Sequence, residues 1–376
     1  MRFCEFTLPW ERIELKSIIK EIKQYTSDFD KYPLYSFTIE NGVTPKTDRY
    51  ERNFLVTKEG DTFKVVPPNT FVMNPMNLRF GAINYSKLDF PVSVSGYYNI
   101  FEIENGKNND FWAAYFLTKS AINLYNSVAT GSLIEKKRVH FSQFIGLKFL
   151  VPTSKEKEKI TYFIRLIDKR LAVQNKIISK YETLIKGIRH RIFGSICGER
   201  QSSLGSFLEE YSEKNIANNL QSVAVGKYGI RKREEIYSKE LSTDYSKNKV
   251  IRKDTLIIGM GSTQIDIGIL TTDDCYCVSP AYTTYRIKGV NSFYLQEYLI
   301  ELNPLLSVRY MITSARQGKA VNKEALMKHL MTVHSENKQK EICQCFENLY
   351  SRLQIEKEML SALQKQKAFL LQSMFI

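Results

Sequence analysis

Polar loops rich in arginine, lysine, asparagine and glutamine carry the most suggestive chemistry in this sequence. Arg and Lys read guanine, and Asn and Gln read adenine, whereas phosphates are bound mostly by Lys, Arg, hydroxyl groups and backbone amides. Any single loop of this kind can also be a solvated surface turn. If these loops do face DNA, we expect contacts from Lys46, Arg49, Tyr50, Arg52, Asn74, Asn77, Arg79, Lys227, Tyr228, Arg231, Lys232, Arg233, Ser262, Gln264, Arg316, Gln317 and Lys319.

The net charge points the same way. Lysine and arginine number 54 against 40 aspartates and glutamates, which leaves +14 at pH 7. Such an excess favours a polyanionic partner, most often nucleic acid, only slightly over a basic protein without one. No apolar run reaches the ~18 residues of a membrane span, and the N-terminus has no signal-peptide pattern. We therefore expect a cytoplasmic protein with reduced cysteines.

Catalytic and metal motifs are weak. Asn74-Pro75-Met76-Asn77 resembles a fragment of a methyltransferase motif but lacks its second proline and its aromatic residue. Gly259-Met260-Gly261 lacks the remaining parts of a phosphate-binding loop. The Cys-x-Cys pairs at Cys275 and Cys277 and at Cys343 and Cys345 have no second pair or histidine at ligand spacing. We predict buried, apolar-type cysteines, no metal and no catalytic residue in this chain. Tyr97, Tyr98, Tyr282 and Tyr285 are expected in the sheet core.

An internal repeat organises the chain. Apolar residues spaced alternately four and three apart from Ile160 to Ile192 recur 182 residues later, from Ile342 to Met374. This a/d pattern predicts two coiled-coil helices, and their simplest burial is against each other in an antiparallel pair. The alternative is that each helix packs against a separate partner protein. The polar interruption recurs too, as Gln174 and Glu356. Helix-pairing residues should include Ile164, Ile167, Leu171, Ile178, Phe346, Leu349, Leu353 and Leu360.

The segments before the two helices echo each other more weakly. Each has an apolar strand, a polar loop, and then a Val-Ser-x-x-Tyr strand followed by a helix, at 111–126 in the first copy and 292–307 in the second. Alternating Val, Ile, Tyr and Phe between Gly and Pro supports strands. The fold class is therefore α+β, with two pseudo-repeated mixed α/β domains and two long helices. The expected boundaries are 1–150, 151–198, 199–330 and 331–376.

This domain–helix–domain–helix order resembles the specificity subunit of type I restriction–modification systems. The helical entries carry the resemblance, with Pro152 ahead of Lys155-Glu156 in the first copy and His334 in place of the proline in the second. The resemblance implies two target recognition domains that each read half of a split double-stranded DNA site. It also implies two docked methyltransferase subunits that hold the S-adenosylmethionine, and a restriction/translocase subunit as an optional further partner. The alternatives are a stand-alone DNA-acting enzyme such as a nuclease, and a protein-only coiled-coil scaffold.

Overall fold

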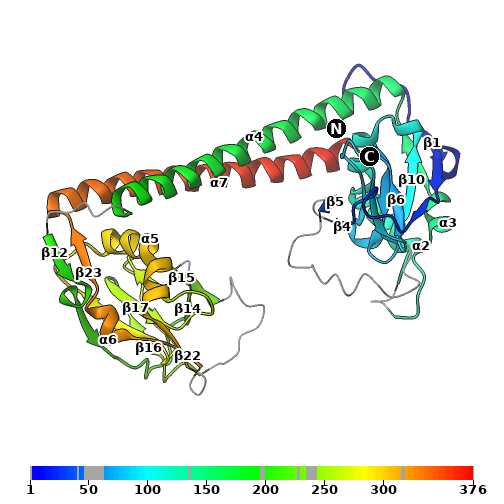
Figure 1. Ribbon diagram of the computed structural model, residues 1–376. Coiled ribbons are helices and arrows are strands. Elements are labelled where there is room, and N and C mark those ends of the chain that lie inside the picture. Colours follow the sequence, from blue (N-terminus) through cyan, green and yellow to red (C-terminus); the bar gives the residue numbers. More distant parts are fainter. Residues whose placement is uncertain are drawn as a thin grey trace. The chain divides into compact units, whose positions relative to one another are not determined.

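The computed structural model describes residues 2–39, 42–45, 63–133, 137–194, 200–226, 229–233, 244–314 and 318–375. The chain divides into two compact units. Unit 1 contains Met1–Asn175 and Met359–Ile376, and unit 2 contains Lys176–Glu358. Each unit therefore combines one mixed domain with a portion of both long helices, which can be followed by colour in Figure 1. The domain boundaries expected from the sequence stay a prediction.

Unit 1 is built on a four-stranded antiparallel sheet in the order β2-β10-β7-β8. A second sheet has the order β3-β6-β9, and two strand pairs, β4–β5 and β1–β11, complete the strands. The strands are β1 Glu11–Glu14, β2 Ile19–Ile22, β3 Tyr25–Thr26, β4 Tyr35–Thr38, β5 Gly42–Pro45, β6 Phe63–Val66, β7 Phe71–Met73, β8 Ile83–Tyr85, β9 Val92–Ser95, β10 Asn99–Ile103 and β11 Lys148–Val151. The short helices are α1 Asn109–Phe116, α2 Lys119–Val128 and α3 Phe141–Ile145.

Unit 2 has a sheet of the same form, in the order β13-β20-β17-β18, together with four two-stranded pairs. These pairs are β12–β23, β14–β15, β16–β19 and β21–β22. The strands are β12 Arg200–Ser203, β13 Leu208–Tyr211, β14 Val223–Gly226, β15 Gly229–Lys232, β16 Lys249–Ile251, β17 Thr255–Gly259, β18 Asp266–Leu270, β19 Tyr276–Val278, β20 Thr283–Ile287, β21 Met311–Ser314, β22 Gly318–Val321 and β23 Leu330–Val333. The helices are α5 Ser292–Tyr310 and α6 Lys323–Met327.

The two domains repeat each other down to single contacts. Lys64 Nζ donates to the backbone oxygen of Tyr98 at 2.8 Å, and Lys249 Nζ donates to that of Tyr282 at 2.7 Å. The turns that lead into β7 and β17 each need a residue with positive φ, Asn69 at 59° in one domain and Asp254 at 62° in the other. Asn and Asp tolerate this left-handed conformation better than most residues. The repeat seen in the sequence is thus a repeat of structure.

Two details differ from expectation. The helix predicted over 111–126 is broken into α1 and α2, because the Thr118 side chain accepts a hydrogen bond from the Ala121 backbone and starts a new helix. Threonine is a favoured N-cap for this reason. The helix predicted over 292–307 is present as α5 and is one turn longer, with Pro304 inside it.

The cysteines also differ from expectation. In each Cys-x-Cys pair one thiol is buried, at Cys277 and Cys343, and the other is exposed, at Cys275 and Cys345. The prediction that they would all be buried was therefore wrong. Cys343 and Cys345 lie in a helix, where positions i and i+2 point to different faces, and Cys275 precedes strand β19, which contains Cys277. Over the residues that the structure describes, no group of three or more His, Cys, Asp or Glu is placed to hold a metal ion.

Aromatic side chains fill the core of unit 1. Trp112, Phe111 and Phe116 of the helical layer are fully buried beside the sheet. Phe375, near the end of the sequence, joins this core, where its ring stacks on Tyr115 with a centroid separation of 4.7 Å. In unit 2, Phe193 takes a similar place against α5. Large buried aromatic rings contribute strongly to stability through the apolar area that they bury.

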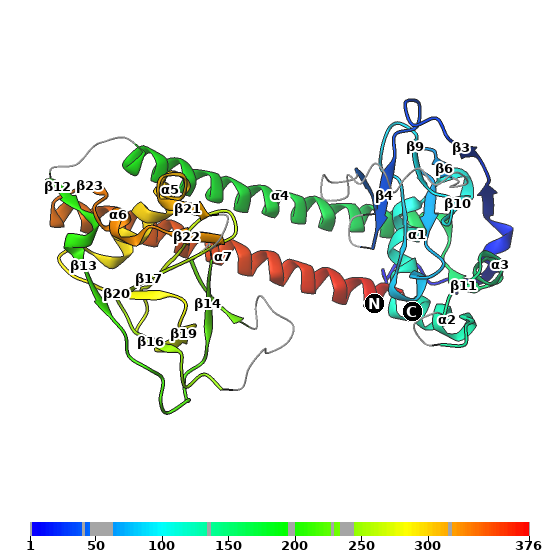
Figure 2. The same cartoon turned by 60° about the horizontal axis from the view of Figure 1, so that its bottom comes forward.

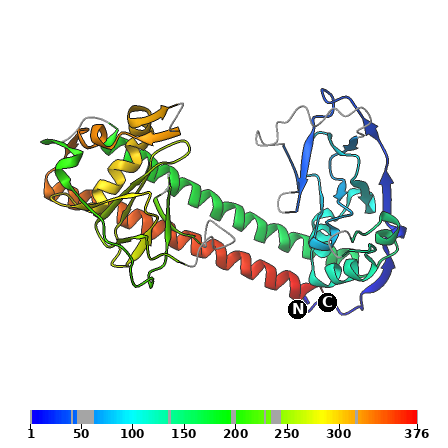
Figure 3. The same cartoon turned by 90° about the horizontal axis from the view of Figure 1, so that it is seen from below.

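The long helices are α4 Ser154–Phe193 and α7 Glu336–Met374. Within each unit their portions lie side by side in opposite directions (Figure 2, Figure 3). In unit 1 Lys367 forms an ion pair with Asp168, and in unit 2 Lys357 forms one with Glu182. Of the predicted helix-pairing residues, Ile164, Ile178, Phe346 and Leu353 are buried, and Ile167, Leu171, Leu349 and Leu360 are half-buried.

The polar interruptions of the stripe are buried as well, at 5% exposure for Gln174 and 4% for Glu356. A buried polar residue in a coiled-coil stripe costs stability and helps to specify register. No helix among the described residues is long and apolar enough to cross a membrane.

A charged cluster joins each domain to the long helices of its own unit. In unit 2, Glu297 of α5 is fully buried, and its carboxylate accepts from Arg189 Nε of α4 at 2.8 Å and from Tyr350 Oη of α7 at 3.0 Å. In unit 1, Asp110 accepts from Tyr85 Oη at 2.5 Å and from Arg165 Nε of α4 at 2.6 Å. Burial would raise the pKa of Asp110, but these two partners and nearby Lys87 hold it below its ordinary value.

Candidate nucleic-acid interface

The basic residues at 231–233 of unit 2 are positioned by a hairpin. Strands β14 and β15 pair from Val223–Lys232 to Gly226–Gly229, and they pack across β18, the edge strand of the main sheet. A Cβ atom on Gly268 of β18 would lie 2.8 Å from Cγ1 of Ile230. Only glycine lets the hairpin come this close, because real Cβ atoms do not make such short contacts.

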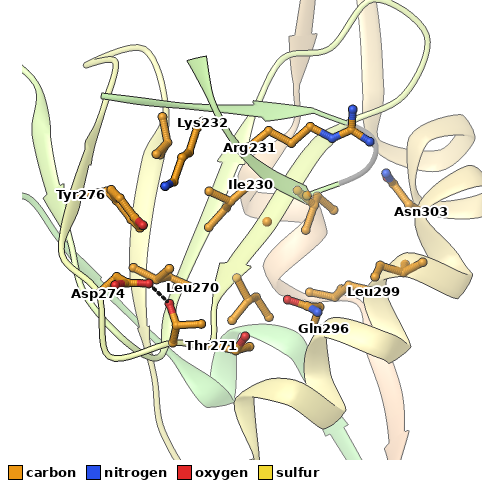
Figure 4. A pocket seen from close by; sticks show the side chains of 17 residues that line it. Ile230, Arg231, Lys232, Leu270, Thr271, Asp274, Tyr276, Gln296, Leu299 and Asn303 are labelled. Atoms are coloured by element: carbon orange, nitrogen blue, oxygen red, sulfur yellow. Dashed lines mark hydrogen bonds between the residues drawn. The ribbon is translucent and has the colours of Figure 1, made fainter. Parts of the chain in front are cut away.

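A pocket of about 350 Å³ lies between this hairpin and α5. Figure 4 shows Lys232 and Tyr276 on one side of it, and Gln296 and Leu299 from α5 on the other. Arg231 and Lys232 are exposed at its rim, so their cationic groups are accessible while their stems cover apolar surface. The pocket is lined both by apolar side chains, such as Ile230 and Leu299, and by hydrogen-bonding side chains, such as Gln296 and Asn303.

One polar group in this wall is already used within the protein. Asn303 donates from Nδ2 to the backbone oxygen of Ile265 at 2.9 Å and accepts from Ser307 Oγ at 3.1 Å. Ser307 in turn accepts from the backbone N–H of Ile265. This network anchors the loop between β17 and β18 onto α5. Buried polar groups that are satisfied in this way fix a local conformation.

The β17–β18 loop brings together residues that are far apart in the sequence. Ser262 is exposed and Gln264 is half-buried, and both lie in this loop. Lys319 of β22 donates from Nζ to the backbone oxygen of Ser262 at 2.5 Å. The structure therefore places three of the predicted DNA-contacting residues in one cluster. Such a mixture of cation, hydroxyl and amide suits both phosphate and base contacts.

Gly259 explains why the Gly259-Met260-Gly261 motif is present. A Cβ atom there would lie 2.1 Å from Cδ1 of Tyr282, so the ring lies directly on the glycine backbone. Tyr282 also donates from Oη to the backbone oxygen of Val225 at 3.2 Å, which ties strand β14 to β17. The glycine thus serves packing of the tyrosine.

The four tyrosines predicted for the sheet core mostly follow that expectation. Tyr285 is buried, and Tyr98 and Tyr282 are partly buried against their cores. Tyr97 is 46% exposed, so for this residue the prediction was wrong. It lies in the turn between β9 and β10, where a side chain can point to solvent.

In unit 1 the predicted loop is the connection between β7 and β8. The Asn74 side chain accepts from the backbone N–H of Met76 at 3.0 Å and so shapes the turn. Asn77 is exposed. Arg79 donates from Nε to Asn126 Oδ1 of α2 at 2.7 Å, so this cation is held against a helix. Asn74 and Arg79 thus have structural partners in this loop.

The other predicted contact residues lie outside the described residues: Lys46, Arg49, Tyr50, Arg52, Lys227, Tyr228, Arg316 and Gln317. Sequence reasoning also passed over one carboxylate, Asp266, which begins β18 beside the Ser262 loop. Burial raises its pKa above the ordinary value. The available signal was its position between two glycines that each approach a neighbouring segment closely, Gly261 and Gly268.

Comparison with known proteins gives likeness of structure alone. No family model matches the sequence. No curated protein matches it either. A solved structure described as showing complex assembly and conformational transition of the type I R-M system is similar with a TM-score of 0.59 and 14% identity over 97% of each chain. The type I restriction-modification system S subunit from M. genitalium is similar with a TM-score of 0.52 and 14% identity, over 98% of this chain and 96% of that one. From end to end, the chain has the fold of the specificity subunits of type I restriction–modification systems.

Proposed function

We propose that this chain is the DNA-reading, non-catalytic subunit of a type I restriction–modification complex in the cytoplasm. The observation that carries the proposal is the duplication of one domain with matching strand order, each copy joined to a long helix. Two related readers in one chain fit a DNA target in two specified parts. The likeness to specificity subunits over nearly the whole chain supports the same function.

The charge distribution supports DNA as the ligand. The chain carries +14, and the hairpin and loop cluster of unit 2 present Arg231, Lys232 and Lys319 close to hydroxyl and amide groups. Cations on phosphates supply affinity that weakens with salt, and amides and carboxylates on base edges supply selectivity. The same arrangement does not suit a scaffold that binds only protein.

The long helices carry apolar side chains that their own unit does not cover. In unit 1, Leu166, Val173 and Phe369 are exposed, and in unit 2 Leu184 and Ile355 are exposed. Exposed apolar residues repeated along helices are typical of a protein-binding surface. We infer that they dock methyltransferase subunits, which bind the S-adenosylmethionine and modify adenine. A restriction/translocase subunit is an optional third component.

Methylation mapping tests the proposal. The chain is co-expressed with the methyltransferase subunit encoded beside it, in a host that lacks adenine methylation, and modified bases are mapped by single-molecule sequencing. The expected result is a split motif, two short specified blocks around a fixed unspecified gap. Charge reversal at Arg231 and Arg233 should then weaken recognition of one block only, and its matched control is charge reversal at the exposed Lys328.

The other outcomes separate the alternatives. Methylation at a continuous, undivided site would contradict the two-reader proposal. Cleavage or methylation of DNA by the purified chain alone would favour a stand-alone enzyme. A stable protein complex that shows no preference among DNA sequences would favour a scaffold.

A further inference from the structure

Asp266 occupies an unusual place in unit 2. It is the first residue of β18 and pairs with Gly259 across the sheet. Its Oδ1 atom lies 2.6 Å from where a Cβ on Gly261 would be, and 4.0 Å from where one on Gly226 would be. The backbone of Gly261 therefore packs directly against the carboxylate, at a distance that no side chain would allow, and the backbone of Gly226 lies close by. Gly261 precedes Ser262, and Gly226 is the last residue of β14.

The carboxylate has no side-chain or backbone partner within the described part of the chain, although it is partly buried. Asp266 follows directly after the loop that carries Ser262 and Gln264, and Lys319 donates to the backbone of that loop. A half-buried carboxylate without a hydrogen bond costs free energy, and burial accordingly raises its pKa. Such a cost is common where a group is kept ready for a ligand.

The equivalent position in unit 1 holds a different residue. Leu256 of β17 corresponds to Phe71 of β7, because each pairs with an aromatic residue of the neighbouring strand, Tyr285 of β20 and Phe101 of β10. Three residues further on, Gly259 pairs with Asp266, whereas Asn74 donates from its backbone to Ala82 at 2.9 Å. Ala82 is buried and apolar. The carboxylate is therefore a feature of the second domain alone, as expected for a residue that makes the two domains read different sequences.

We propose that Asp266 accepts a hydrogen bond from the N4 amino group of a cytosine in the half-site that the second domain reads. This inference rests on the proposed function and deepens it. An ionised carboxylate has only acceptors, so it is repelled by phosphates and needs a donor on a base edge. In the major groove the donors are cytosine N4 and adenine N6. Adenine places its N7 acceptor next to N6, which repels a carboxylate, whereas cytosine has no acceptor beside N4.

The test uses the complex with its methyltransferase subunit and a library of double-stranded DNA in which each base pair of the mapped second half-site is varied. Rates of methylation are compared for the wild-type protein, Asp266→Asn and Asp266→Ala. At one position the wild-type protein should prefer cytosine by roughly 5- to 150-fold. Both variants should lose that preference at that position only, with the first half-site read as before. Asp273→Asn is the matched control, because Asp273 is exposed in the same domain and its substitution removes the same charge.

Two results would overturn the proposal. An unchanged cytosine preference in both variants would show that Asp266 reads no base. A uniform loss of selectivity at all bases of the second half-site would show that Asp266 merely supports the loop. The melting temperature of the isosteric variant Asp266→Asn, measured alongside, separates this outcome from unfolding. Failure of the proposed function would look different, since the wild-type protein would then show no split motif.

Discussion

Replacement of Glu297 by alanine should destabilise unit 2 severely. Glu297 is fully buried, and its carboxylate is the common acceptor for Arg189 and Tyr350, which also bond to each other at 2.6 Å. Burial alone would lower the pKa of Arg189, but Glu297 and Tyr350 more than offset this, so the guanidinium stays charged. The variant leaves that cation and a phenol without their acceptor in a low-dielectric site.

Removing one partner of a buried ion pair costs about 3–5 kcal/mol. At about 2–4 °C per kcal/mol for a unit of this size, the melting temperature should fall by about 6–20 °C. Differential scanning calorimetry of the full chain, with hydrogen exchange to locate the loss in α5, measures the effect. The exposed pair Glu324–Lys328 gives the control, because Glu324→Ala should leave the melting temperature nearly unchanged.

A triple variant tests the reasoning itself. If the cost arises from an unpaired buried charge, replacing Arg189, Glu297 and Tyr350 together by Met, Met and Phe should be much less destabilising than Glu297→Ala alone. If the triple variant is as unstable as the single one, the loss comes from packing and the electrostatic argument fails. A single variant within about 1 kcal/mol of the wild-type protein would refute it outright.

Three further predictions concern stability. The pKa of Asp110 is depressed in the folded state, so its stabilising effect is complete above the ordinary pKa and is lost as the pH falls below it. Asp110→Asn should therefore flatten the loss of stability between about pH 5 and 2, as followed by acid unfolding of unit 1. An unchanged stability profile would contradict this prediction. Gly259→Ala should lower the free energy of unfolding by about 1–3 kcal/mol, as measured in urea, because the added methyl group clashes with the Tyr282 ring. The loss should largely disappear when Tyr282 is also replaced by alanine. Gly187→Ala, in α4 with no atom within 4 Å of the added Cβ, should raise stability by about 0.5–1 kcal/mol in thermal unfolding, and a loss would show that this helix needs the glycine.

The parts of this fold that depend on periodicity could be predicted from the sequence. The 4-3 stripe placed Ile164 and Phe346 correctly on the buried face of the helices, because helical geometry alone decides that face. The repeated Val-Ser-x-x-Tyr segments occupy equivalent places, at the end of β9 and of β19, but the prediction of one continuous strand was wrong because a turn separates β9 from β10 and β19 from β20. The break at Thr118 was missed, since a cap that depends on one side-chain bond outweighed a continuous apolar pattern.

The candidate site depends on tertiary contacts that no local pattern contains. The approach of the β14–β15 hairpin to Gly268, and the contact of Lys319 with Ser262, join segments separated by tens of residues. The sequence signal for Asp266 was only its position between Gly261 and Gly268, and its surroundings depend on tertiary contacts with Gly261 and Gly226. Composition could indicate which loops are polar, but only the fold decides which of them share one surface.

The position of Phe375 has a consequence for the order in which the protein is made. Its ring stacks on Tyr115 inside the core of unit 1 and contacts Trp10 near the start of the chain. At about 5–20 residues per second, translation separates the synthesis of the first of these residues from the last by tens of seconds. The aromatic core of unit 1 therefore cannot be completed until Phe375 has been synthesised, long after Trp10 and Tyr115.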